Sequence, residues 1–219
     1  MNPWPALGQE PPFVLPDDRE AIVQFNARAT ERTRLELDLL PEPFVGRLDA
    51  PVVLLTLNPG VSDGDFALHN DPAFRDRIRA CHRQDKVAWP YYYLAPEVTG
   101  PGARWSARVL GPLIRELSLG AVSRGVALFE YLPYHSRGFG HARLEVASQA
   151  FTMAAVRVSI ASAAAIFITR GAKLWSTAIP ELVGHPHLFT TRSTQNIVIS
   201  PRNCPAGWDS AVAGIRQAG

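Results

Sequence analysis

The stretch Pro51-Val-Val-Leu-Leu-Thr-Leu-Asn-Pro-Gly60 decides the fold. Its apolar run is continuous rather than alternating, which is typical of a strand buried on both faces of a parallel sheet. Asn58-Pro59-Gly60 then ends the run in a tight loop. A strand of this kind needs helices over both faces of its sheet, so the stretch predicts an α/β domain.

The same pattern recurs along the chain. Apolar strands are predicted at 126–132, 163–169 and 197–199, and a further segment at 188–191 is a weaker strand candidate. Helical periodicity and start signals predict helices at about 17–39, from Asp71 onward, at about 105–117, and over 148–161, 172–182 and 209–217. The alternation predicts a three-layer α/β/α sandwich with a central, mostly parallel sheet of about four strands.

Composition limits the class of protein. The 219 residues are 47% hydrophobic and 19% charged, which suits a single domain over residues 1–219. Residues 1–16 form a Pro-rich arm that is expected to lie over the surface. Cys81 and Cys204 are too few for an all-cysteine iron–sulfur site or a Cys-rich zinc site, and we expect no metal and no cofactor. Without a signal-peptide pattern or a membrane-length apolar run, we expect a cytoplasmic protein that does not bind membranes.

The net charge of +2 is unevenly divided along the chain. Residues 1–130 carry 14 Lys and Arg against 17 Asp and Glu, whereas residues 131–219 carry 8 against 3. Of the 22 basic residues 20 are Arg, whose planar fork suits phosphate, although codon composition is the simpler reason for this preference. The C-terminal half is therefore the half expected to meet an anion.

Ligand sites in sheets of this kind lie beyond the carboxyl ends of the strands. No GxGxxG loop follows the first strand, and no P-loop, GxSxG or HExxH motif occurs, which argues against dinucleotide enzymes, P-loop NTPases and zincins. The predicted strand exits instead carry polar residues of other kinds. They are Asn58-Pro59-Gly60, Glu130 to Ser136, Arg170-Gly171 and Ser200-Pro201-Arg202-Asn203.

Three of these exits, in this order, resemble the uracil-DNA glycosylase superfamily. Leu55-Thr-Leu-Asn-Pro-Gly60 resembles its first motif in the Asn-Pro-Gly form of the mismatch-specific and single-strand-selective branches. Ile199-Ser-Pro-Arg-Asn203, followed by Trp208, is similar to the second motif of the single-strand-selective branch. Leu128-Phe-Glu-Tyr-Leu-Pro133 falls where that family has the strand ending in a base-reading Asn. The resemblance covers the chain from about residue 50 to the end.

The resemblance implies a monofunctional DNA glycosylase of base excision repair. Such an enzyme flips a damaged or deaminated base out of DNA and hydrolyses its N-glycosidic bond without metal or cofactor. By this resemblance Asn58 orients the attacking water, Pro59, Gly60, Glu130 and Arg170 contact the base, and Phe66 or Phe74 stacks on it. Ser200, Pro201, Arg202 and Asn203 would contact DNA. DNA with a damaged or mispaired base is the expected partner, and no obligate protein partner is inferred.

Two positions depart from the family pattern. Val198 stands where the second motif has a His that donates to the leaving base, and His135 beside the second strand exit is the replacement considered for that catalytic role. Glu130 replaces the base-reading Asn. An ionised Glu only accepts hydrogen bonds and would repel the carbonyls of uracil. Either burial keeps Glu130 protonated, or the preferred base presents donors, or Glu130 pairs with Arg137 or Arg170 and meets no ligand.

Two other classes of function stay open. One is a binding protein that keeps the pocket without hydrolysis and recognises a base, a nucleotide or a nucleic-acid end. The other is a hydrolase of free nucleosides, which needs the pocket but no DNA surface. The run Tyr91-Tyr92-Tyr93 suits either stacking on unpaired bases or packing of a long loop against the core.

Overall fold

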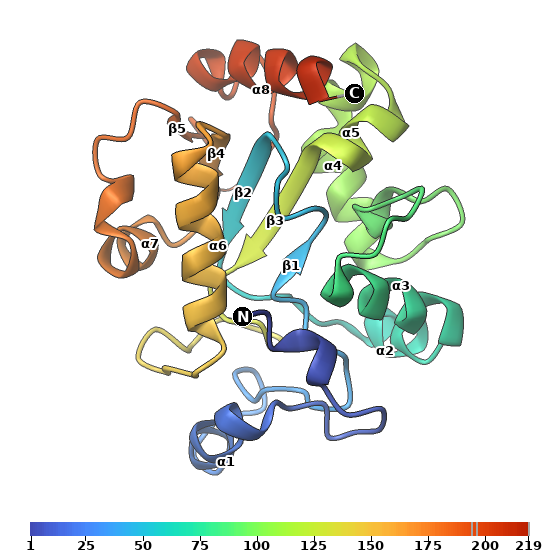
Figure 1. The fold of residues 1–219 in the computed structure, drawn as a ribbon. Coiled ribbons are helices and arrows are strands. Elements are labelled where there is room, and N and C mark those ends of the chain that lie inside the picture. The colour runs from blue at the N-terminus through green and yellow to red at the C-terminus, as the bar shows by residue number, and fades with distance from the viewer. Residues whose placement is uncertain (194, 196, 219) are drawn as a thin grey trace.

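The computed structural model describes residues 1–193, 195 and 197–218. Within them the chain forms a five-stranded sheet of order β1-β3-β2-β4-β5, with helices on both faces (Figure 1). Its strands are β1 (Phe44–Val45), β2 (Val52–Thr56), β3 (Val126–Glu130), β4 (Ala165–Ile168) and β5 (Leu188–Thr190). This α/β architecture with a mostly parallel sheet confirms the coarse fold prediction.

The strand pairing follows from the apolar runs. β2 is central and pairs in parallel with β3 on one side and β4 on the other, and all five of its residues are buried. β5 pairs in parallel with β4, whereas the short edge strand β1 runs antiparallel to β3. The register sets Thr56 opposite Glu130, so the last residues of β2 and β3 meet at one edge of the sheet.

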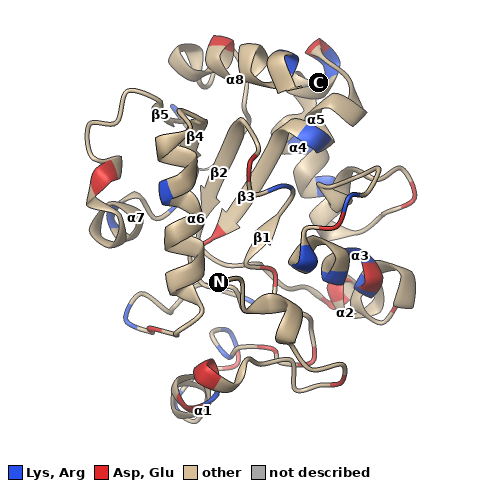
Figure 2. Ribbon diagram, in the orientation of Figure 1, with Lys and Arg blue, Asp and Glu red and all other residues tan. Residues whose placement is uncertain are grey.

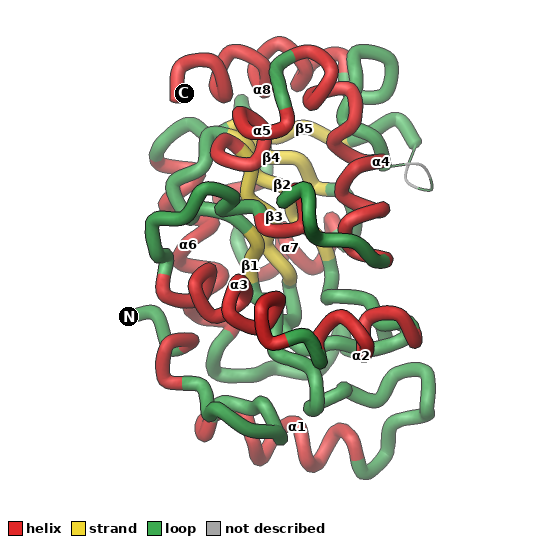
Figure 3. Tube along the Cα trace, turned by 90° about the vertical axis from the view of Figure 1, so that its right-hand side faces the viewer, coloured by secondary structure: helices red, strands yellow, loops and turns green. Residues whose placement is uncertain are grey.

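Helices form the outer layers. They are α1 (Arg19–Asn26), α2 (Asp63–His69), α3 (Pro72–Arg83), α4 (Pro101–Glu116), α5 (Leu119–Gly125), α6 (Gln149–Ala161), α7 (Ala172–Ala178) and α8 (Pro205–Ala218). Turned by 90°, the molecule shows α6 on one side of the strands and α4 on the other (Figure 3). α8 crosses the amino ends of β2 and β3, so their carboxyl ends point away from it toward α1 and α2 (Figure 1).

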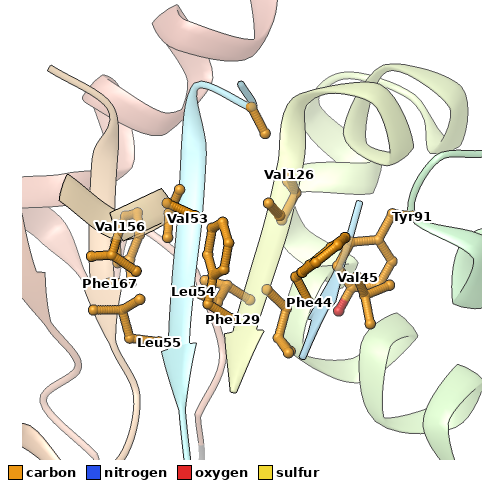
Figure 4. Packing of buried hydrophobic residues seen from close by; sticks show 14 of the residues in the cluster. Phe44, Val45, Val53, Leu54, Leu55, Tyr91, Val126, Phe129, Val156 and Phe167 are labelled. Atoms are coloured by element: carbon orange, nitrogen blue, oxygen red, sulfur yellow. The ribbon is translucent and has the colours of Figure 1, made fainter. Parts of the chain in front are cut away.

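The core runs continuously across the sheet. Val156 of α6 and Phe167 of β4 pack on one side of β2, and Phe44, Val45 and Tyr91 continue the cluster beyond β3 (Figure 4). All five are buried. This packing fixes the sheet edge at which β2 and β3 end. No helix among the described residues is long and apolar enough to cross a membrane.

The Pro-rich N-terminal segment was predicted to lie over the surface as an arm, but its apolar side chains are buried in the core. Trp4 and Phe13 are 1% and 0% exposed and belong to the core cluster. Trp4 packs against the rings of His82 and Tyr134, with centroids 5.6 and 6.2 Å apart. Apolar side chains spaced among the prolines thus anchor the segment, although prolines prevent a regular helix.

The helix predicted over about 17–39 is also wrong, because α1 ends at Asn26. The Asn26 side chain donates to the Leu35 carbonyl at 3.0 Å and accepts from the Leu35 amide at 2.9 Å, which closes a loop. Glu36 then donates its backbone N–H to His135 at 2.9 Å in an isolated bridge. Leu35 is buried through this loop and not through helical periodicity.

Two further expectations, a strand at 197–199 and the inward face of α6, are wrong. Residues 197–199 form no strand, because the Ile199 N–H donates at 2.9 Å to the carbonyl of Val109 on α4 instead of to a neighbouring strand. The weaker candidate, at 188–191, contains β5. The sequence pattern over 148–161 predicts Phe151, Ala155 and Val158 on the inward face of α6, but Val158 is 61% exposed.

Candidate active site

A cavity of about 440 Å³ opens at the carboxyl ends of β2 and β3. Asn58, Glu130 and Arg170, which follow or end three neighbouring parallel strands, all line it. The backbone beyond β2 stays paired with the segment after β3, because Leu132 donates to Leu57 at 2.8 Å and Ser136 to Pro59 at 3.2 Å. These bonds hold the Asn58 loop rigidly against the chain that follows Glu130.

The Asn58 amide is oriented by three acceptors. Its Nδ2 donates to Ser136 Oγ at 2.8 Å, to the Pro59 carbonyl at 3.1 Å and to the Tyr134 carbonyl at 3.4 Å. Carbonyl oxygens only accept, so the opposite amide orientation would face oxygen with oxygen. Among the described residues nothing donates to Oδ1, and Asn58 lines the cavity. The arrangement leaves Oδ1 available as an acceptor for water or a ligand.

Glu130 is a carboxyl group held in its neutral form. It is 6% exposed, and burial raises its pKa to about 8, with a further rise from Glu42 and opposing effects of Thr56 and Arg170. Thr56 Oγ1 hydrogen-bonds Glu130 Oε2 and also the Phe129 carbonyl, which lies 3.0 Å away. A hydroxyl carries one hydrogen, which Thr56 donates either to Glu130 Oε2 or to the Phe129 carbonyl; in the second case the protonated Glu130 donates to Thr56. Glu130 Oε1 then remains an acceptor with no donor among the described residues.

The alternative in which Glu130 forms an ion pair is not found among the described residues. Arg137 instead pairs with Asp63 at 2.9 Å. Arg170 is exposed and lines the cavity. Its charge lowers the pKa of Glu130, but this is the smallest of the contributions to that pKa. Glu130 therefore faces the cavity as a neutral group near a cation.

Aromatic side chains form much of the cavity wall. Tyr91 and Tyr93 are buried in it, whereas Trp105 of α4 and Phe139 are half-buried and so present ring surface to the cavity. The tyrosine run thus packs against the core. Gly102 permits this packing, because a Cβ there would lie 2.4 Å from the Tyr93 ring.

Phe66 and Phe74, the predicted stacking residues, are not among the residues that line the cavity. Phe74 is 2% exposed and its ring packs against His69, Tyr92 and Tyr93 in the core. Phe66 lies half-buried on α2. Trp105 and Phe139, and not these two phenylalanines, are the half-buried aromatic residues in the cavity wall.

Pro59 and Gly60 line the cavity beside Asn58, as expected. A Cβ on Gly60 would meet no atom within 4 Å, so the glycine is not required by packing within the protein. It leaves open space at the cavity mouth instead.

His135, considered as the replacement for the missing motif His, is not brought to the cavity. It is 2% exposed and absent from the cavity lining. Its ring nitrogens approach backbone carbonyls, Nδ1 at 3.2 Å from Gly60 and Nε2 at 3.0 Å from Leu40. Both nitrogens thus lie against backbone carbonyls, and neither faces the cavity.

A buried polar cluster lies behind the cavity wall and was not foreseen from the sequence. Glu42 lines the cavity, and its Oε1 accepts from Tyr92 and Tyr93 hydroxyls at 2.9 and 2.7 Å. His69 Nε2 lies 3.9 Å from the same oxygen. Burial raises the pKa of Glu42 and lowers that of His69 to about 2, so His69 is neutral. Ligand atoms of Glu42, His69 and His135 lie within 4.8 Å of one another, and these residues could hold a metal ion.

The turn at Ser200 to Asn203 is only partly connected with the cavity. None of its four residues lines the cavity, although Ile197 just before it does. Pro201 and Arg202 are exposed, and Ser200 closes the turn by accepting from the Asn203 amide at 3.2 Å. The Asn203 side chain donates to the Val198 carbonyl at 3.0 Å and accepts from the Ser193 amide at 2.9 Å. Arg202 is the member of the turn best placed to reach a phosphate.

The basic excess of the C-terminal half is partly neutralised. Arg137 and Arg216 pair with Asp63 and Glu116 of the other half, at 2.9 and 2.8 Å. Charged residues of both signs are spread over helices and loops rather than gathered into one stripe (Figure 2). Positive charge at the cavity therefore rests mainly on Arg170, with Arg202 on the turn beyond it.

A larger hollow of about 800 Å³ lies between α3 and the loop that follows β1. Its wall includes Cys81, whose pKa burial raises to about 12, so the thiol is not a nucleophile. Arg47 pairs there with Asp49, and Asp85 pairs with Arg83, both at 2.7 Å, whereas Asp76, Lys86 and Arg124 form no ion pair among the described residues. The lining of this hollow includes none of the residues at the carboxyl ends of β2, β3 and β4.

Sequence reasoning missed the parts of the cavity that come from outside the strand exits. Glu42, Asp65 and Ser106 line it, as does Trp105. Glu42 stands between two prolines without any motif, and Trp105 is one of several apolar positions on its helix. Asp65 carries a local signal, because Ser62 and Asp65 form a capping box at α2.

No family model matches the chain, and neither a curated protein nor a solved structure was found to be similar to it.

Proposed function

We propose that this protein is a DNA glycosylase of the uracil-DNA glycosylase type that removes deaminated bases. One observation carries the proposal: two acceptors without donors among the described residues, Asn58 Oδ1 and Glu130 Oε1, belong to side chains that line the same cavity. A volume of about 440 Å³ accommodates a flipped base, and half-buried aromatic rings of Trp105 and Phe139 line it.

The neutral carboxyl of Glu130 selects the base by a ring N–H. Its Oε2 is engaged with Thr56, so Oε1 accepts a single hydrogen bond. Uracil, hypoxanthine and xanthine carry a ring N–H at the position where cytosine and adenine, the parents of the first two, carry only an acceptor nitrogen. A neutral carboxyl does not repel the flanking carbonyls as an ionised one would. Burial of Glu130 thus resolves the conflict between this residue and uracil.

Asn58 and Arg170 supply the remaining chemistry. Asn58 Oδ1 accepts a hydrogen from water and aims its oxygen at the glycosidic carbon, since the amide is fixed by Ser136 and two carbonyls. Negative charge develops on the departing base, and the Arg170 guanidinium stabilises it, because Arg137, the other cation in the cavity wall, pairs with Asp63. Arg170 takes the part that a motif His plays in the family, since Val198 carries no donor side chain.

The test is cleavage of oligonucleotides that carry one uracil, hypoxanthine or xanthine, single- and double-stranded, against undamaged controls. We expect alkali-labile sites at the deaminated base with the native protein and none with Asn58→Ala. Asn70→Ala is the matched control, because Asn70 is exposed and its side chain, among the described residues, bonds only to Arg75, at 3.3 Å. Absence of cleavage by the native protein, or equal cleavage by Asn58→Ala, would refute the proposal.

Two variants of Glu130 test the mode of base recognition. Glu130→Gln keeps an acceptor oxygen and replaces the donating O–H with a donating N–H, so it should retain cleavage at pH 7. Glu130→Ala removes the acceptor and should lose cleavage. Loss in both variants would mean that Glu130 acts as an ionised group.

A second candidate function is binding of a base or nucleic-acid end without hydrolysis. It is favoured by Val198 at the motif His position and by the absence of the Ser200–Asn203 turn from the cavity wall. This function predicts salt-sensitive binding of the same oligonucleotides without alkali-labile sites. Neither binding nor cleavage of DNA would leave free nucleosides as the substrates to test.

A further inference from the structure

The buried cluster of Glu42, His69 and His135 joins three separate parts of the chain. Glu42 precedes β1, His69 ends α2, and His135 follows β3. The three side chains are 4%, 1% and 2% exposed, and their ligand atoms all lie within 4.8 Å of one another. The His69 and His135 rings meet edge to face with centroids 4.9 Å apart.

His69 is the member that the protein leaves unsatisfied. Neither Nδ1 nor Nε2 has a hydrogen-bond partner among the described residues, and both atoms are buried. Glu42 Oε1 lies 3.9 Å from His69 Nε2, beyond hydrogen-bond distance. A buried polar group without a partner destabilises the folded protein, so its retention in the core calls for a partner.

We propose that Glu42, His69 and His135 bind one divalent transition-metal ion, zinc by the nature of the donors. Two imidazoles and a carboxylate are a donor set that zinc takes with water in the fourth position. This site lies behind the cavity wall and goes beyond the proposed glycosylase function, which uses no metal. It also differs from the expectation that the chain binds none.

The surroundings of the three residues suit a metal ion. Ligating carboxylates are themselves hydrogen-bonded, as Glu42 Oε1 is by Tyr92 and Tyr93. Ligating histidines usually donate their second N–H to a carbonyl. His135 has a carbonyl beside each nitrogen, so it coordinates through one nitrogen and keeps the other bond. Two ligand atoms on one zinc ion lie about 3.3 Å apart, so the 3.9 Å between His69 and Glu42 closes by a small side-chain movement.

Metal binding by Glu42, His69 and His135 would link the loop of Asn58 to the rest of the domain. His135 touches the Gly60 carbonyl, and Glu42 is part of the cavity wall. A bound ion would hold α2, the segment before β1 and the segment after β3 together. The native chain should therefore unfold at a higher temperature with zinc than after treatment with a chelator.

The test is metal uptake by the full-length protein. Chelator-stripped protein is mixed with a small excess of ZnCl₂, freed of unbound metal by gel filtration, and analysed for zinc by mass spectrometry. We expect about one zinc per native chain. His69→Gln and Glu42→Gln should bind zinc more than about 100-fold more weakly, since even changes around the ligands cost 10–100-fold.

His185 and His187 provide the matched control. Their rings lie 5.8 Å apart in a loop remote from the cluster, and they form the other histidine pair that could take up zinc adventitiously. The double variant His185→Ala, His187→Ala should retain the full equivalent. Loss of zinc in this control with retention in His69→Gln would overturn the proposal, as would the absence of zinc from the native chain.

Folding of the ligand variants does not limit the test. Native protein loaded with Co²⁺ should develop the visible absorption of a four- or five-coordinate ion with nitrogen ligands, and one equivalent of Zn²⁺ should abolish it. Native protein should also show a zinc-dependent rise in Tm that His69→Gln lacks. Cobalt that stays fully hydrated in the native protein would count against the site whatever the variants do.

Discussion

Asn58 and Asn203 are the same residue type in two loops that resemble two motifs of one family, yet the structure uses them differently. Asn203 engages both ends of its amide inside the protein, donating to Val198 at 3.0 Å and accepting from Ser193 at 2.9 Å. Within the part of the chain that the structure describes, Asn58 engages its nitrogen alone, and its side chain lines the cavity. The two side chains thus differ in their free acceptors: Asn58 keeps its oxygen for a ligand, whereas Asn203 uses its amide to close a turn.

On the cavity side of this comparison, Glu130 should have the largest effect, and this effect is on the pH dependence of stability. Its folded pKa of about 8 exceeds the value of 4.5 expected when unfolded. Between these pH values the unfolded chain releases a proton that the folded chain keeps, so stability falls as pH rises from about 4.5 to about 8. At about 1.4 kcal/mol per pKa unit, the loss is at most about 5 kcal/mol. Urea denaturation from pH 5 to 9 should show this slope in the native protein and not in Glu130→Gln. Equal slopes would mean that Glu130 ionises freely.

Alanine at the two asparagines tests the comparison directly. Asn58→Ala should reduce kcat by about 10²–10³-fold, or about 3–4 kcal/mol of barrier, with a small change in stability. Asn203→Ala should do the reverse, lowering the free energy of unfolding by about 1–3 kcal/mol with kcat within a few-fold. Both are measured by single-turnover cleavage and urea denaturation. Equal losses of kcat would place the turn in the catalytic machinery and remove the distinction.

Trp105 tests whether the cavity holds a stacked base. Trp105→Ala should weaken binding of an oligonucleotide with a deaminated base by about 1–3 kcal/mol, because the ring is half-buried in the cavity wall. Phe74→Leu is the comparison, since Phe74 packs in the core and should change stability and not affinity. Fluorescence anisotropy measures the binding. An unchanged Kd in Trp105→Ala would argue against stacking there.

Arg202 gives the smallest expected effect and tests the turn as a DNA contact. Arg202→Gln should weaken binding of all DNA sequences alike and reduce the slope of log K against log salt by about one. Arg216→Gln is a control, because Arg216 pairs with Glu116 on a distant helix. The same slope in the native protein and Arg202→Gln would remove the turn from the DNA surface.

The parts of the fold that the sequence predicted are those decided locally. The continuous apolar runs of β2, β3 and β4 predict buried parallel strands, and their exits identify Asn58, Glu130 and Arg170. Parallel strands bring their carboxyl ends to one edge, so chain order alone places these residues together.

The remaining parts depend on partners distant in the sequence. The segment 197–199 is as apolar as a strand, but its N–H donates to the carbonyl of Val109 on α4. Trp105 and Glu42 reach the cavity through packing of loops and helices, which leaves no local pattern. His135 resembles a catalytic residue by position, whereas two backbone carbonyls determine where its nitrogens lie.

Tyr134 connects the N-terminal segment with the loop of Asn58. Its hydroxyl donates to Asp18 at 2.7 Å and accepts from the Leu15 amide at 3.3 Å, while its carbonyl accepts from the Asn58 amide. Truncation of the first eighteen residues would therefore free the residue that helps to aim Asn58. We therefore expect that neither a fragment that starts at β1 nor a circular permutation that opens this segment keeps Asn58 in its present orientation.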